Sequence, residues 1–126
     1  MKTNVSKQQQ QEAAMARIWV LTQPTGNGRQ EIVRADVITS VSGDTDNVVA
    51  LRSDTRALVS LAVGPGPTSR RKPLPTGFHV SFLQVMDEVV RDMVDLDKLV
   101  MAEWVIDKEE WRWAVQDIED LAPREF

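Results

Sequence analysis

Between residues 17 and 63 the chain repeats one pattern, a short run rich in β-branched residues followed by a cluster of turn-forming residues. Arg17–Thr22 is apolar on both faces, as in a strand buried on two sides. Gln23–Gly28 contains a proline and ends in an Asn-Gly pair, which favours a hairpin from Arg17–Thr22 into Arg29–Arg34. Three further runs continue the series: Asp36–Val41, Val48–Arg52 and Ala57–Val63. The pattern predicts four or five short strands (about one every ten residues), forming an antiparallel meander or a partly open barrel.

A loop rich in proline and glycine is predicted at residues 64–77. It contains four of the six prolines and the basic cluster Arg70, Arg71 and Lys72. Proline cannot donate to a strand ladder and stiffens the chain, so the segment should be an extended surface loop. A basic arm that contacts phosphates, a proline-rich segment that docks in an aromatic groove, and a solvated linker all fit this composition.

An amphipathic helix is predicted over residues 82–94. Its apolar positions recur at spacings of three and four residues, and Ser81 with Gln84 forms a capping-box pattern. The apolar positions are Phe82, Val85, Met86, Val89, Val90 and Met93. The alternation of Phe78, Val80 and Phe82 suggests one short strand just before this helix.

A second helix is predicted over residues 107–122. Asp107 and Glu110 form another capping-box pattern, and an apolar stripe follows. The stripe consists of Trp111, Ala114, Val115, Ile118 and Leu121. Between the two helices, Leu99–Ile106 fits a buried helix segment and a strand equally well.

These elements define an α+β fold, in which the β-structure of residues 17–63 packs against helices 82–94 and 107–122. Residues 16–123 form one predicted domain, and the polar residues 1–15 form a disordered tail. At 126 residues the chain is long enough to bury a core without disulfides, and it contains no cysteine. With no apolar run of membrane-spanning length, we expect no membrane association and a cytoplasmic location.

Charge is divided unequally along the chain. Residues up to Met86 include 10 Lys and Arg against 6 Asp and Glu, whereas residues from Asp87 onward include 5 against 13. On the predicted helix 107–122, Trp113 points away from the apolar stripe, and its neighbours Glu110, Asp117 and Asp120 are acidic. Trp113 is therefore either buried between two layers or an exposed anchor for a partner.

This acidic face predicts a non-catalytic protein–protein interaction module, such as an adaptor, inhibitor or immunity-type factor, that meets a partner with a basic surface. The predicted contact residues are Trp104, Glu110, Trp113, Asp117 and Asp120. The alternative is a small nucleic-acid-associated regulator that contacts phosphates, although the net charge of −4 opposes it. Its phosphate-contacting residues would be Arg70, Arg71 and Lys72, joined by Arg52 and Arg56. A homodimer is a further alternative.

The sequence contains few candidates for catalytic or metal-binding residues. His79 is the only histidine, and the chain contains no metal-binding or cofactor-binding motif and no catalytic motif. Asp44–Asn47 begins like a calcium loop but lacks the glycine and glutamate that such a loop needs, so it should be a turn. We expect no enzymatic activity, no cofactor and no metal.

The segment Ile18–Leu51 contains the predicted hairpin, then Ala35–Ile38 and Asp46–Leu51, and a helix with Asp87–Val90 follows. This arrangement resembles the small FlbD-type flagellar proteins, and a similar strand pattern occurs in the LytTR type of DNA-binding domain. The resemblance implies a bacterial-type regulator, is confined to the strand pattern and transfers no binding residue.

Overall fold

The computed structural model describes residues 13–14, 16–24, 28–92 and 97–122. Within them the chain forms strands, the helix α2 and two short 3-10 turns at Ala35–Val37 and Ile118–Asp120. The strands and the helix are β1 (Ile18–Leu21), β2 (Ile32–Arg34), β3 (Ile38–Gly43), β4 (Asn47–Arg52), β5 (Leu58–Val63), α2 (Phe78–Asp92), β6 (Lys98–Val105) and β7 (Glu110–Asp117). The predicted α+β class is confirmed.

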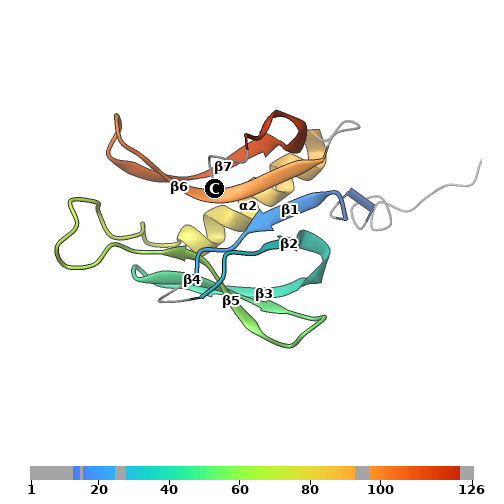
Figure 1. Ribbon diagram of the computed structural model, residues 1–126, viewed down its shortest axis with the longest axis horizontal. Helices are drawn as coiled ribbons and strands as arrows, with labels where there is room; N and C mark the ends of the chain where they lie inside the picture. Colours follow the sequence, from blue (N-terminus) through green and yellow to red (C-terminus); the bar gives the residue numbers. More distant parts are fainter. Residues whose placement is uncertain (1–12, 15, 25–27, 93–96, 123–126) are drawn as a thin grey trace, which may run out of the picture.

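The described strands form two sheets that share one helix (Figure 1). One sheet has the order β3-β4-β5 and is wholly antiparallel. The other has the order β2-β1-β6-β7, in which β1 pairs antiparallel with β2 and parallel with β6. The strands of residues 17–63 are therefore divided between two sheets that do not close into a barrel.

The strands predicted at Val48–Arg52 and Ala57–Val63 are confirmed as β4 and β5, and Asp36–Val41 overlaps β3. In β4, Val48 and Ala50 are fully buried and alternate with half-buried neighbours, as expected for a strand with one face on the core. The predicted pairing of β1 with the segment Arg29–Arg34 is also confirmed, although β2 covers only Ile32–Arg34. Residues 25–27 of that connection lie outside the described residues.

The helix predicted over residues 82–94 is confirmed as α2, but it begins at Phe78. The predicted short strand through Phe78, Val80 and Phe82 is wrong, because Phe78 and Phe82 are one helical turn apart and both are buried. The Ser81 backbone N–H donates to the Gly77 carbonyl at 3.0 Å, so Ser81 lies inside the helix and does not cap it. Residues 93–94 lie outside the described residues.

The helix predicted over residues 107–122 is wrong, because residues 110–117 form β7 and only Ile118–Asp120 form a 3-10 turn. Of the ambiguous segment Leu99–Ile106, residues 99–105 belong to β6 and Ile106 begins the turn, and the eight-residue strands β6 and β7 pair in an antiparallel hairpin. Cross-strand pairs of aromatic and β-branched residues stabilise β6 and β7. The apolar residues that were expected to form one stripe of the helix 107–122 therefore lie in a strand and a 3-10 turn. Asp107 lies in the hairpin turn.

One core joins the two sheets and α2. It contains buried residues of both sheets, the helix and the loop. These are Ile18, Val20, Ala35, Val48, Ala50, Leu61, Ala62, Leu74, Phe78, Phe82, Met86, Val89, Val100, Ala102 and Trp113. The described part of the chain contains no helix that is long and apolar enough to cross a membrane. Of the predicted tail, residues 1–12 and 15 lie outside the described residues.

Candidate functional site at the loop and hairpin end

The basic loop 64–77 is tied at both ends to the turn between β3 and β4. The Gly64 backbone N–H donates to the Asp46 carbonyl at 2.6 Å, and the Leu74 N–H donates to the Thr45 carbonyl at 3.0 Å. The Leu74 side chain is buried in the core. A β-carbon at Gly64 would lie 2.9 Å from the Thr45 oxygen, so this close approach requires glycine. The loop therefore has fixed ends.

The turn that holds the loop is itself organised by Asp44. Its carboxylate accepts hydrogen bonds from the backbone N–H groups of Asp46 at 2.8 Å and Asn47 at 3.0 Å. Both bonds lower the pKa of Asp44 below its ordinary value, and the bond from Asn47 has the larger effect. The acidic segment that begins at Asp44 thus forms a turn that positions the loop.

In the middle of the loop, the backbone and one arginine contact Trp111 of β7. The Trp111 indole Nε1–H donates to the Lys72 carbonyl at 2.8 Å. The guanidinium carbon of Arg71 lies 5.9 Å from the Trp111 ring centroid, within the range of a cation–π interaction. Trp104 of β6 lies directly opposite Trp111 in the hairpin, with ring centroids 5.5 Å apart in an edge-to-face arrangement.

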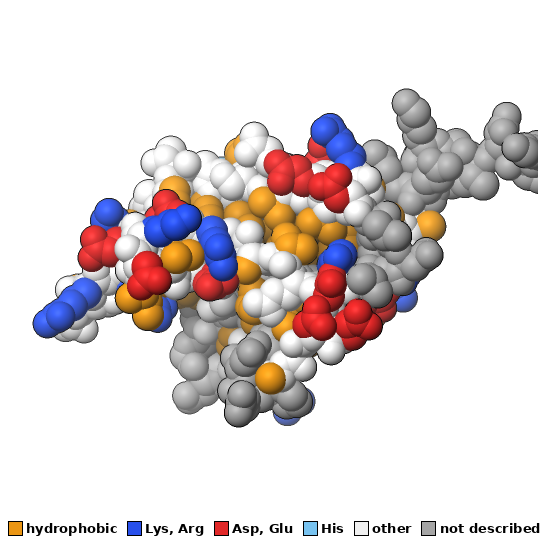
Figure 2. Space-filling view, turned by 90° about the horizontal axis from the view of Figure 1, so that it is seen from above, with side chains coloured by type: hydrophobic (Ala, Val, Ile, Leu, Met, Phe, Trp, Pro, Cys, Tyr) orange, Lys and Arg blue, Asp and Glu red, His pale blue; other side chains and the backbone are white. Residues whose placement is uncertain are grey.

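We call the resulting surface the loop–hairpin surface and define it by Arg70, Arg71, Lys72, Trp104, Ile106 and Trp111. The three basic residues are exposed, and the two tryptophans are half-buried. Ile106 begins the hairpin turn, and its side chain is 76% exposed. The loop and the hairpin project at the same end of the molecule (Figure 1), where charged and hydrophobic side chains are interspersed (Figure 2). The ion pairs of the described residues involve neither Arg70, Arg71 nor Lys72.

Trp113 is buried between α2 and β7, where sequence reasoning left an exposed anchor open. Its ring stacks on Phe78 with centroids 4.5 Å apart and lies edge-on to Phe82 at 4.9 Å. Its Nε1–H donates to the Phe78 carbonyl at 2.9 Å. Trp111, which sequence reasoning assigned to the core, packs against the core and is half-buried, as Trp104 is. Trp111 and Trp113 have the same parity in β7 and lie on the same face of the strand, so alternation alone does not distinguish their surroundings.

The acidic residues predicted to surround Trp113 do not share one face. In the strand β7, Glu110 points to the opposite side from Trp113 and Asp117 because their positions differ in parity. Glu110 is exposed beside the hairpin turn, and Asp117 forms an ion pair with Lys98 across the ladder. Asp120 is exposed in the 3-10 turn that follows. The predicted acidic helical face therefore does not exist.

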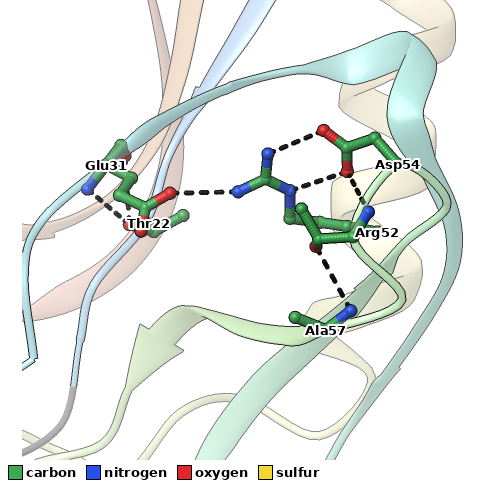
Figure 3. A network of polar contacts seen from close by, with 6 residues as sticks. Thr22, Glu31, Arg52, Asp54 and Ala57 are labelled. Carbon is green, nitrogen blue, oxygen red and sulfur yellow. Dashed lines mark hydrogen bonds and ion pairs between the residues drawn. The ribbon is translucent and has the colours of Figure 1, made fainter.

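Arg52, a further candidate for phosphate contact, is engaged with two carboxylates (Figure 3). Its guanidinium donates to Asp54 at 3.0 and 2.7 Å and to Glu31 at 3.0 Å. The hydrogen bond from Arg52 lowers the pKa of Asp54. Arg52 thus links the β4–β5 turn to the segment before β2, and its charge is paired with two carboxylates.

A separate apolar groove of about 200 Å³ lies between α2 and β3. Its apolar lining residues are Ala35, Ile38, Val41, Phe82, Leu83 and Met86. In the part of the chain that the structure describes, no group of three or more His, Asp or Glu side chains is placed to hold a metal ion. In the comparisons with known proteins, no family model, no curated protein and no solved structure matches this chain significantly.

Proposed function

We propose that this protein is a non-catalytic protein–protein interaction module that binds its partner through the loop–hairpin surface. The observation that carries the proposal is the contact of Lys72 and Arg71 with Trp111. This contact fixes a basic segment beside two half-buried tryptophans and leaves its charges without carboxylate partners among the described residues. An adaptor, an inhibitor or an immunity-type factor would use such a surface. The absence of cysteine fits a reducing compartment such as the cytoplasm.

The composition of this surface resembles that of interaction sites in general. Tryptophan and arginine are enriched among the residues that contribute most to binding, and charged groups belong at the rim. A loop that is held in place before binding loses less conformational entropy when the complex forms. The hydrogen bonds at Gly64, Leu74 and Trp111 hold the loop in this way.

Affinity purification from the native source, with quantitative mass spectrometry, tests the proposal. The baits are the wild type, Ile106→Asp, Arg71→Glu and the control Leu58→Asp. Leu58 is 70% exposed on β5, in the other sheet, so its substitution matches Ile106→Asp in chemistry. We expect at least one partner to be retained by the wild type and the control and lost by both surface variants. The proposal would be contradicted if all four baits retained the same partners. Size-exclusion chromatography of the wild type shows separately whether the partner is a second copy of the chain.

A nucleic-acid-associated regulator is the second candidate, because the cations of Arg70, Arg71 and Lys72 are exposed on one loop. Phosphate contacts release counterions, so binding would weaken steeply as the salt concentration rises. An electrophoretic mobility assay with duplex DNA and with single-stranded RNA at two salt concentrations tests this candidate. Binding that disappears at higher salt and in the variant Arg70→Glu/Arg71→Glu/Lys72→Glu would support it.

A further inference from the structure

We infer that the loop–hairpin surface recognises an acidic peptide segment that carries a large apolar side chain next to its carboxylates. This inference rests on the proposed function and names the chemistry of the partner. It also reverses the expectation from the sequence, which was a partner with a basic surface.

The charge of the loop determines the first half of this recognition. Arg70, Arg71 and Lys72 are consecutive and exposed, and no ion pair within the described residues neutralises them. Trp111 holds the backbone at Lys72 and lies within cation–π distance of the Arg71 guanidinium. A planar guanidinium with restricted motion binds a carboxylate through two parallel hydrogen bonds at a reduced entropic cost.

The apolar half comes from the hairpin. Ile106 is 76% exposed at its turn, and the half-buried Trp104 lies two residues before it. Trp104 contacts the edge of Trp111, which in turn contacts the loop. A ligand that pairs with Arg71 and extends along the hairpin past Trp104 would reach the exposed side chain of Ile106, and burial of an apolar residue there would add affinity.

The surroundings favour a short acidic peptide over a nucleic acid. Asp107, Glu109 and Glu110 are exposed on the same hairpin and would repel any anion that continued past the loop, so the carboxylates of the ligand must be confined to the few residues that face Arg70–Lys72. The net charge of −4 also opposes the long-range attraction on which nucleic-acid binding depends. A peptide of a few residues is long enough to contact all three cations of the loop.

Selection from a random peptide display library on the immobilised full chain tests the inference. We expect the selected peptides to be enriched in Asp and Glu next to Leu, Ile, Phe or Trp. Fluorescence anisotropy then measures the best selected peptide against the wild type and its variants. Because a charged hydrogen bond is lost, we expect Arg71→Ala to weaken binding about tenfold or more. Arg71→Lys keeps the charge without the planar fork and should give an intermediate affinity.

Two further readouts separate a binding role from a structural one. Arg91→Glu reverses an exposed charge on α2 and should leave the affinity unchanged. In a ¹H–¹⁵N spectrum, the indole N–H of Trp111 should shift when the peptide is added, whereas that of the buried Trp113 should not. The same spectrum of each variant shows that the fold is retained.

Neutral or basic selected peptides, or acidic peptides that still bind the variant Arg70→Glu/Arg71→Glu/Lys72→Glu, would overturn the inference. If purification finds a partner that both surface variants lose but the selected peptides are neutral or basic, the proposed function stands and the acidic chemistry falls. Selection of no peptide, with loop-dependent binding of an oligonucleotide in its place, would contradict both.

Discussion

Trp113 of β7 lies flat against Phe78 at the start of α2, with an interplanar angle of 18° and a hydrogen bond from its indole to the Phe78 carbonyl. This one contact joins the first turn of the helix to the last strand of the sheet. It also brings the end of the basic loop to a fixed place, because Phe78 follows the loop directly. The buried tryptophan therefore supports the candidate site without being part of it.

Trp113→Ala should destabilise the fold by about 3–5 kcal/mol, because it removes a large buried side chain and leaves a cavity. Trp113→Phe keeps a ring against Phe78 but loses the hydrogen bond, and it should cost about 1–2 kcal/mol. Urea unfolding followed by circular dichroism measures both values. Leu83→Ala is the control on the exposed side of α2, where the side chain is 55% accessible. A cost at Trp113 no larger than that at Leu83 would contradict the core position.

Trp111→Phe should loosen the basic loop, because the phenyl ring cannot donate to the Lys72 carbonyl. The expected cost in global stability is about 1 kcal/mol. Limited trypsin digestion should show faster cleavage after Arg70 and Arg71, since both are exposed. Trp104→Phe keeps an aromatic ring opposite Trp111 and is the matched control. Equal cleavage rates in the two variants would show that the hydrogen bond does not restrain the loop.

Asp44 should make stability depend on pH. Its pKa is lowered in the folded protein, so its contribution is present above the ordinary value of 3.8 and is lost as the pH falls through the lower folded value. The stability difference between the wild type and Asp44→Ala should therefore be largest at neutral pH and shrink in strong acid. Asp44→Asn keeps an acceptor oxygen without the titrating charge. The stability difference between Asp44→Asn and Asp44→Ala should therefore not change with pH. Urea unfolding at several pH values measures these differences.

Asp44 should also influence the loop, because the turn it organises supplies the carbonyls that bind Gly64 and Leu74. Hydrogen exchange at these two amides should accelerate in Asp44→Ala at neutral pH. Unchanged exchange at both amides would show that the loop ends are held independently of the turn.

Glu109 has a positive φ of 50° in the hairpin turn, where a side chain is strained. Glu109→Gly should therefore be more stable than Glu109→Ala by about 1 kcal/mol. The comparison is matched because both variants remove the same charge and differ only in the β-carbon. Thermal unfolding measures the difference, and a more stable alanine variant would refute the assignment of strain.

Local patterns predicted the elements whose periodicity agrees with their environment. In β4 the alternating burial follows the sequence, and in α2 the spacing of Phe82, Met86 and Val89 matches the buried face. In β7 two periodicities overlap, because Trp111, Ala114 and Val115 fit a helix while Trp111, Trp113 and Val115 fit a strand. The pairing with β6 decides between them, and no local pattern encodes that pairing.

Of the candidate site, the sequence predicted the basic cluster and Trp104, but not Ile106 or Trp111. The cluster at Arg70–Lys72 is visible in the sequence because proline and glycine surround it. The contact between Lys72 and Trp111 joins residues 39 positions apart. It depends on the β6–β7 hairpin, which local sequence patterns did not predict. For the same reason, the acidic residues assigned to one helical face belong to different faces and elements.

The parallel pairing of Ile18 with Lys98 has a consequence for the order in which the molecule can form. During synthesis β1 emerges early, and its neighbour β6 emerges only after the other sheet and α2. The three-stranded sheet can pair from local contacts, whereas the four-stranded sheet requires nearly the whole chain. A nascent chain that stops before Lys98 would leave one edge of β1 without its partner and exposed to other strands.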